Sequence, residues 1–134
     1  MVIFIQFELF RSKHRTMEEV KSYTHLIVWQ KSIEVCTLVF RLTQDFPGTE
    51  IYGLTSQLRR AAVSVPANIS EGHSRNSRKE YRHFIGIARG SLAEVETLIT
   101  ISKALQFTSE NKINEVTYLC TEISKMLNSL NKKL

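Results

Sequence analysis

Proline and glycine are scarce in this chain of 134 residues, which has two prolines and five glycines. A protein of many short strands needs frequent turns, and the residues that form turns are mostly missing here. The composition therefore argues against a many-stranded β protein and favours long helices. The length is sufficient for one domain with a substantial core, but not for two.

Cysteine is nearly absent, and the apolar runs are short. Cys36 and Cys120 both fall in helical patterns on or near the apolar side, which predicts two buried thiols in a reducing cytoplasm rather than a disulfide framework. No run approaches the roughly 18 apolar residues of a membrane span. The apolar start, MVIFIQFELF, contains Glu8 and lacks the basic region and cleavage site of a signal peptide. We therefore expect a cytoplasmic protein that does not contact a membrane.

Motifs of catalysis and of cofactor binding are also missing. The four histidines have no H-x-x-x-H spacing, and P-loop, dinucleotide-binding and nucleophile-elbow motifs are absent. Glu71, His73 and His83 are chemically suited to acid–base cleavage of RNA, but no motif fixes their geometry. We therefore predict no enzymatic activity, no catalytic residue, no metal, no cofactor and no small-molecule substrate.

Helical periodicity is the main feature that the chain does contain. Apolar residues recur at spacings of three and four in four segments. The expected helices run from residue 26 to a stop at Pro47-Gly48, from about 51 to a C-cap at Gly72, from 78 to about 107, and from about 108 to the C-terminus. Ser77 and Glu80 form a capping box for the third helix. Short connections favour antiparallel neighbours, so we predict an all-α fold, an up-down antiparallel four-helix bundle.

The bundle domain is expected to span residues 23–134, after an N-terminal extension of residues 1–22. The first sixteen residues share no periodicity with the rest, and Met17 opens the acidic, helix-favouring stretch MEEVKSY. One interpretation is that Met17 is the true start and that the preceding residues are an upstream extension. The alternative is a short appended strand or helix that packs on the domain. We assign no function to these residues.

Pro66 interrupts the second helix. It removes one backbone hydrogen bond and clashes with the Ala62 carbonyl, at a cost of about 3 kcal/mol in an ideal helix. The surrounding stretch, AAVSVPA, consists of compact side chains, so a bend is sterically easy there. We therefore expect one helix that is kinked at Pro66 and keeps its apolar face on the core. Ser64 is placed to satisfy the carbonyl that the proline leaves free.

The third helix is the longest, and its apolar surface is wider than a simple core requires. Four of its seven heptad positions are largely apolar, and they include Ile85, Ile87 and Ile101. Gly86 and Gly90 each lower the stability of the helix by about 1 kcal/mol relative to alanine. Close approach of another backbone would offset this loss. The excess width predicts a second interface, most simply with another copy of the chain. The alternative is a helix that is fully buried in its own bundle.

Positive charge is concentrated in the middle of the chain. The window from Arg59 to Arg89 has seven basic and two acidic residues, an excess of five that equals the net charge of the whole chain. Such a patch attracts phosphate backbones. The candidate nucleic-acid-binding residues are Arg59, Arg75, Arg78, Lys79, Arg82 and Arg89. Cations are unfavourable at a helix N-terminus, so something other than helix stability is expected to place Arg78 and Lys79 there.

Two other interpretations of these charges stay open. In one, carboxylates such as Glu71, Glu94 and Glu96 neutralise the arginines within an oligomer. In the other, the patch binds an acidic protein.

Three stretches, LIVWQKSIEV, YGLTSQLRRAAVSVPANISEG and SRKEYRHFIGIARGSLAEVET, closely resemble the bacterial four-helix bundle proteins encoded by intervening sequences within 23S rRNA genes. The similarity extends from about Leu26 to the end of the fourth helix. It implies assembly as a homopentamer. It also implies kinship with the basic pentameric accessory protein of diversity-generating retroelements, which works with a reverse transcriptase and nucleic acid. Within the matched motifs, Arg60, Glu71 and Glu94 are candidates for intersubunit or structural ion pairs.

Two function classes follow from these observations. The first is a non-enzymatic, oligomeric accessory protein that binds RNA or an RNA–protein complex through the basic patch at the turn between the second and third helices. The second is a protein-binding scaffold with no direct contact to nucleic acid. We favour the first, because the implied kinship with the retroelement accessory protein adds weight to the patch.

Overall fold

The computed structural model describes residues 22–134 and contains four long α-helices in that range. They are α2 (Ile27–Thr43), α3 (Leu54–His73), α4 (Arg78–Ala104) and α5 (Glu110–Lys133). Two short 3-10 turns, η2 (Tyr23–His25) and η3 (Gly48–Glu50), precede α2 and α3. The described residues contain no strand. The predicted N-terminal extension lies outside them except for Ser22, whose hydroxyl accepts a hydrogen bond from the Thr24 backbone.

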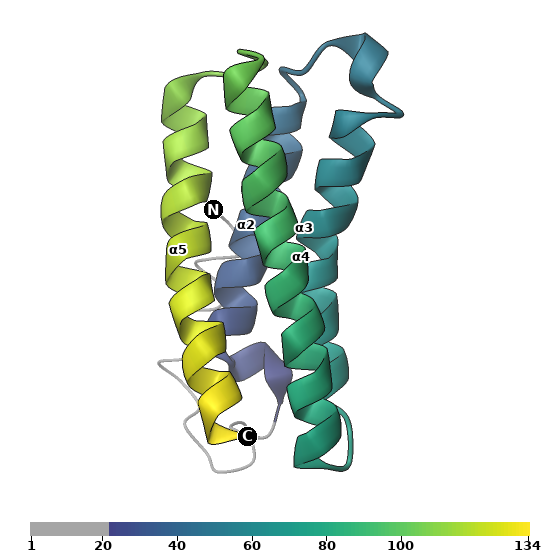
Figure 1. Cartoon of the computed structure of the whole chain (residues 1–134), viewed down its shortest axis with the longest axis vertical. Coiled ribbons are helices and arrows are strands. Elements are labelled where there is room, and N and C mark those ends of the chain that lie inside the picture. The colour runs from purple at the N-terminus through teal and green to yellow at the C-terminus, as the bar shows by residue number, and fades with distance from the viewer. Residues whose placement is uncertain (1–21) are drawn as a thin grey trace.

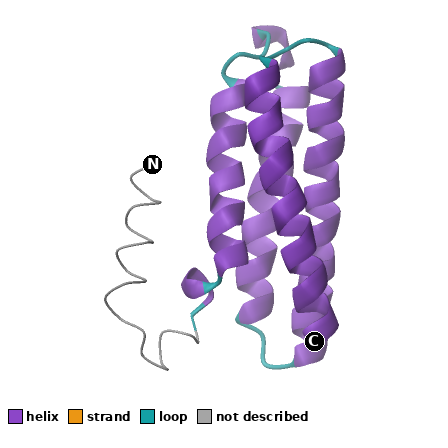
Figure 2. Ribbon diagram, turned by 90° about the vertical axis from the view of Figure 1, so that its left-hand side faces the viewer, coloured by secondary structure: helices purple, strands orange, loops and turns teal. Residues whose placement is uncertain are grey.

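The four helices run up and down beside one another, so the predicted antiparallel bundle is confirmed (Figures 1 and 2). Helix α4 packs against α3 and α5, and α2 completes the bundle by packing against the same two helices. The α2–α3 and α4–α5 connections lie at one end of the bundle, and the α3–α4 turn and the C-terminus lie at the other (Figure 1). No helix among residues 22–134 is long and apolar enough to cross a membrane.

Branched aliphatic side chains from all four helices form one core. Its largest fully buried members are Leu42, Leu58, Ile69, Ile85, Leu92, Ile123, Leu127, Val35, Val39, Val65, Val95 and Val116. Burial of one such side chain contributes about 1.5–3 kcal/mol relative to exposure. The shared core therefore holds the four helices in a single domain.

Helix α3 continues through Pro66 without a break, and Pro66 itself is buried. The carbonyl of Ala62 lacks its helical partner, because proline has no backbone N–H. The Cys36 thiol of α2 donates a hydrogen bond to this carbonyl, with Sγ 3.1 Å from the oxygen. Ser64, which we expected in this role, instead pairs with Ser91 of α4 at 2.7 Å. The kink at Pro66 stays a prediction.

Gly72 was predicted as the C-cap of the second helix, and this prediction was wrong. The helix continues to His73 and has Ser74 as its C-cap. Gly72 is buried where α3 meets α4, and a Cβ there would lie 2.8 Å from the Phe84 Cβ and 3.1 Å from Tyr81 Cδ1. The absence of a side chain therefore lets the start of α4 approach α3 closely.

Gly86 and Gly90, unlike Gly72, have open surroundings. Both are exposed on α4, and a Cβ at either position would meet no atom within 4 Å. The close backbone approach that we expected at these glycines does not occur within the described chain. Contact with a second molecule would offset their cost to the helix.

Helix α4 ends at Ala104, before the predicted stop at about residue 107. Gln106 takes the left-handed conformation, with φ of 57°. Its N–H donates to the Lys103 carbonyl, and the N–H of Phe107 donates to the Ser102 carbonyl. This pair of bonds is a Schellman motif, which usually has glycine at the left-handed position. Glutamine in that position gives no sequence signal for the end of the helix.

We expect Gly72→Ala to lower the free energy of unfolding by about 1–3 kcal/mol, because the added methyl group overpacks the α3–α4 contact. Gly48→Ala is the matched control. Open space surrounds that position, and its φ is not positive, so alanine should leave the free energy of unfolding unchanged or raise it by up to about 1 kcal/mol. Urea unfolding followed by circular dichroism measures both effects. A neutral Gly72→Ala substitution would contradict the close contact.

The two free thiols, of which Cys120 is buried and Cys36 is partly buried, predict how stability depends on pH. Burial raises the pKa of Cys36 and of Cys120 from 9.0 to about 12, and the charge of Glu96 adds to the shift at Cys120. The unfolded chain loses these protons first as the pH rises. The free energy of unfolding should therefore be unaffected by the thiols below pH 9 and fall between about 9 and 12, by up to about 1.4 kcal/mol per pH unit for each thiol.

Urea unfolding across this pH range measures the effect. The control is the double substitution Cys36→Ser and Cys120→Ala, which removes both thiols and should flatten the dependence. Equal slopes for the two proteins would show that the thiols are not desolvated.

Candidate nucleic-acid interface

The turn between α3 and α4, residues 74–77, ends in the cap that the sequence predicted. The Ser77 hydroxyl accepts a hydrogen bond from the Glu80 backbone N–H at 3.2 Å and donates to the Glu80 carboxylate at 3.1 Å. Ser77 is therefore the N-cap of α4. The cap fixes the first turn of the helix, where Arg78 and Lys79 are exposed at the end of the bundle.

Arg75 lies in this turn and is held by neighbours from its own chain. Its guanidinium forms an ion pair with Glu71 and lies over the Phe84 ring, 4.8 Å from the ring centroid. Both charges are largely exposed, so the pair contributes little to stability. It does give Glu71 a structural partner, and it neutralises one of the candidate cations.

Arg59 lies near the opposite end of α3, so the structure separates it from the turn. It donates a hydrogen bond to the Thr43 hydroxyl at 2.8 Å and lies over the Phe40 ring, 4.8 Å from the centroid. The helix from Arg59 to His73 is about 21 Å long at 1.5 Å per residue. Arg59 therefore belongs to the contact between α2 and α3.

Four candidates remain as exposed cations on α4, and we call them the α4 cations: Arg78, Lys79, Arg82 and Arg89. None of them forms an ion pair with any of residues 22–134. Arg78, Arg82 and Arg89 are four and seven residues apart, so they share one side of the helix. Positive charges without counter-charges produce a local potential that attracts phosphate groups.

Arg60 and Glu94 were expected to form ion pairs, within the chain or between subunits. Within the described chain they form none: Glu94 accepts a hydrogen bond from the Gln57 side chain at 3.3 Å, and Arg60 is exposed on α3. An ion pair of either residue across subunits stays a prediction.

The opposite side of α4 carries exposed apolar residues. Ile87 and Ile101 are 40% and 41% exposed, and Leu105 at the end of the helix is 54% exposed. Ile87, Glu94 and Ile101 are seven residues apart, and the contact of Glu94 with Gln57 shows that this side of α4 is the one towards α3. The bundle therefore leaves part of the wide apolar surface of α4 uncovered.

The part of the chain that the structure describes contains no metal-binding cluster, and it does not bring Glu71 and His73 together as an acid–base pair. Residues 22–134 hold no set of three or more histidine, cysteine, aspartate or glutamate side chains placed to bind a metal ion. His73 contacts Tyr81 edge to face, with 5.7 Å between ring centroids, and burial lowers its pKa. Glu71 is engaged with Arg75 instead of with a histidine.

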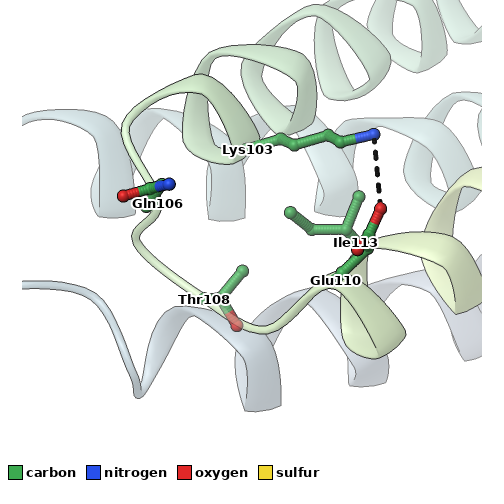
Figure 3. A pocket seen from close by; sticks show the side chains of 5 residues that line it. All are labelled: Lys103, Gln106, Thr108, Glu110 and Ile113. Atoms are coloured by element: carbon green, nitrogen blue, oxygen red, sulfur yellow. Dashed lines mark ion pairs between the residues drawn. The ribbon is translucent and has the colours of Figure 1, made fainter.

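A hollow of about 350 Å³ opens at the α4–α5 loop (Figure 3). Its lining residues are Lys103, Gln106, Thr108, Glu110 and Ile113. It lies at the end of the bundle opposite the α3–α4 turn, so it is separate from the α4 cations.

Fold and surface together define a four-helix bundle protein with exposed cations on one helix that form no ion pair within residues 22–134. The chain belongs to the 23S rRNA-intervening sequence protein family, whose model matches residues 24–129. That match confirms the family resemblance seen in the three sequence stretches.

Among solved structures, the chain is similar to a protein with unknown function from the S23 ribosomal protein family of Bacteroides thetaiotaomicron. The two chains are 22% identical and superpose with a TM-score of 0.71, over 79% of this chain and 99% of that one. At this identity the likeness shows the fold alone. Among curated proteins, none matches the chain significantly.

Proposed function

We propose that this protein is a non-enzymatic accessory protein that binds RNA or an RNA–protein complex through the α4 cations. The observation that carries the proposal is the set of four exposed cations without carboxylate partners in residues 22–134, on a member of a family whose name refers to 23S rRNA. Contacts between phosphates and Lys or Arg side chains supply most of the sequence-independent affinity of nucleic-acid-binding proteins.

We also propose that the protein acts as an assembly of identical copies, a homopentamer in the form that the family resemblance implies. The uncovered side chains Ile87 and Ile101, together with the open space at Gly86 and Gly90, give α4 a side that another helix can approach closely. In a closed ring every copy would present its α4 cations. The number of simultaneous phosphate contacts would then increase with the number of copies.

RNA binding should depend strongly on salt, because bound cations displace counterions from the phosphates. Arg78→Gln combined with Arg82→Gln should weaken binding. It should also reduce the slope of log affinity against log salt concentration by about two for each copy of the chain that contacts the RNA, one for each lost phosphate contact. Fluorescence anisotropy with a labelled RNA hairpin at several salt concentrations measures both quantities.

The matched control removes two exposed cations elsewhere, by Arg41→Gln combined with Lys103→Gln. It should leave the slope nearly unchanged, and equal losses in the two variants would contradict a local patch. A wild-type protein that binds no RNA at low salt, yet retains a protein partner regardless of salt and nuclease, would establish the scaffold alternative instead.

Self-association should be visible by sedimentation velocity at micromolar concentration. Ile87→Glu combined with Ile101→Glu should release single chains with unchanged circular dichroism, because burial of unpaired carboxylates at an apolar contact is strongly unfavourable. Tyr118→Glu is the control, since Tyr118 is 69% exposed on α5, and it should leave the assembly intact. A wild-type chain that sediments as one copy would contradict the assembly.

A further inference from the structure

Helices α4 and α5 are antiparallel neighbours, and one ion pair shows which of their sides meet (Figure 1). Lys103 of α4 and Glu110 of α5 contact each other, with Nζ 4.0 Å from the carboxylate oxygen (Figure 3). Steps of seven residues keep a side chain on the same side of a helix. The ion pair therefore defines two rows of residues that face one another along the bundle.

On α4, steps of seven back from the ion pair reach Glu96, Arg89 and Arg82, and Arg78 lies one turn further. All four are exposed. The pKa of the Cys120 thiol on α5 is raised by burial and also by the charge of Glu96. This interaction places the row on the α5 side of α4, opposite the side that carries Ile87.

On α5, steps of seven and four from Glu110 reach Thr117, Thr121, Asn128 and Lys132. All four are exposed. Because the helices are antiparallel, Asn128 and Lys132 lie beside the N-terminal half of α4. Neither residue is among the sequence-predicted candidates, because the excess of positive charge in the sequence lies between Arg59 and Arg89.

The charge of this surface changes along its length. Near the α4–α5 loop it contains the Lys103–Glu110 pair and Glu96. Near the other end the exposed side chains of the two rows are those of Arg78, Arg82, Arg89, Asn128 and Lys132, and none of these is acidic. Glu80 of α4 is engaged with Ser77. We name this second part the basic α4–α5 face, formed by Arg78, Arg82, Arg89, Asn128 and Lys132.

The size and chemistry of the basic α4–α5 face match a duplex backbone. The row from Arg78 to Arg89 is about 16 Å long at 1.5 Å per residue. Phosphates of one strand recur about every 3.4 Å along the axis of a DNA duplex and no further apart in an RNA duplex, so the row is long enough to reach several phosphates. Arginine binds phosphate oxygens bidentately, and the Asn128 amide can both donate to and accept from a hydroxyl group.

Aromatic rings for base stacking are missing from this surface. The exposed aromatic rings of the described chain are those of Phe40, Tyr52, His83 and Tyr118, and none of these residues belongs to the two rows. Proteins that bind single strands combine a basic surface with such rings. Double-stranded RNA, by contrast, is recognised through its phosphates and 2′-hydroxyl groups.

We infer that the basic α4–α5 face binds the phosphate backbone of double-helical RNA, and that α5 supplies part of the site. The inference rests on the proposed function, to which it adds a second helix and the form of the nucleic acid. Arg78, Arg82, Arg89 and Lys132 contact phosphates, and Asn128 contacts ribose 2′-hydroxyl groups. Recognition by this surface does not depend on base sequence.

The test changes α5 alone. Asn128→Asp places a carboxylate within the basic α4–α5 face, and Asn114→Asp makes the same change at an exposed position nearer the start of α5. Fluorescence anisotropy with a labelled RNA duplex at fixed salt should show about tenfold weaker binding for Asn128→Asp and a change below about twofold for Asn114→Asp. Lys132→Gln should reduce the salt slope by about one for each copy of the chain that contacts the duplex.

Two further arms use a DNA duplex of the same sequence and the single-stranded RNA. The RNA duplex should bind most tightly, and tighter binding of either alternative would overturn the assignment to double-helical RNA. Unchanged binding by Asn128→Asp and Lys132→Gln, with loss in the Arg78→Gln and Arg82→Gln variant, would overturn the role of α5 and leave the proposed function in place. Absence of RNA binding by the wild-type protein would overturn both.

Discussion

The contact between α3 and α4 at Gly72 determines how the surface of this bundle is arranged. Because residue 72 is a glycine, the Phe84 Cβ can lie close to its backbone. A Cβ on residue 72 would be only 2.8 Å from the Phe84 Cβ. The start of α4 is thereby held against the end of α3, and the Phe84 ring is placed under the Arg75 guanidinium. The buried face of α4, which includes Ile85, Leu92 and Val95, sets the rotation of the helix about its axis. The contact at Gly72 holds the start of the helix close to α3 in that rotation.

The rotation gives the exposed surface of α4 two sides of different chemistry. Towards α3 lie Ile87 and Ile101, beside glycines with open space around them. Towards α5 lie Arg82 and Arg89, without carboxylate partners in the described chain. Apolar contact and phosphate binding need opposite surroundings, because one excludes water and the other depends on charge. Helix α4 can serve both apolar contact and phosphate binding because its apolar side and its basic side are separate.

Periodicity was sufficient to predict the four helices and their antiparallel order, and the local pattern at Ser77 was sufficient to predict the cap of α4. Periodicity indicates which side of a helix is buried, but not which neighbour comes closest, so the role of Gly72 was not visible. The end of α4 was missed because Gln106 is not a residue that marks left-handed backbone. The excess of charge identified the basic window. It did not reveal that Phe40 and Phe84 lie beneath two of its arginines, since neither ring is on the same helix as its arginine.

The uneven placement of cations along the bundle also has a consequence for how the molecule meets a polyanion. At the α4–α5 loop, lysines are matched by carboxylates, as in the contact between Lys112 and Asp45 at 2.6 Å, whereas the end near the α3–α4 turn has an excess of unmatched cations. The described chain therefore has an electric dipole moment along its long axis. The field of a nucleic acid exerts a torque on such a dipole and turns the positive end forward before any contact forms. Copies held side by side in the same direction would add their moments, so that one rim of the assembly leads the approach.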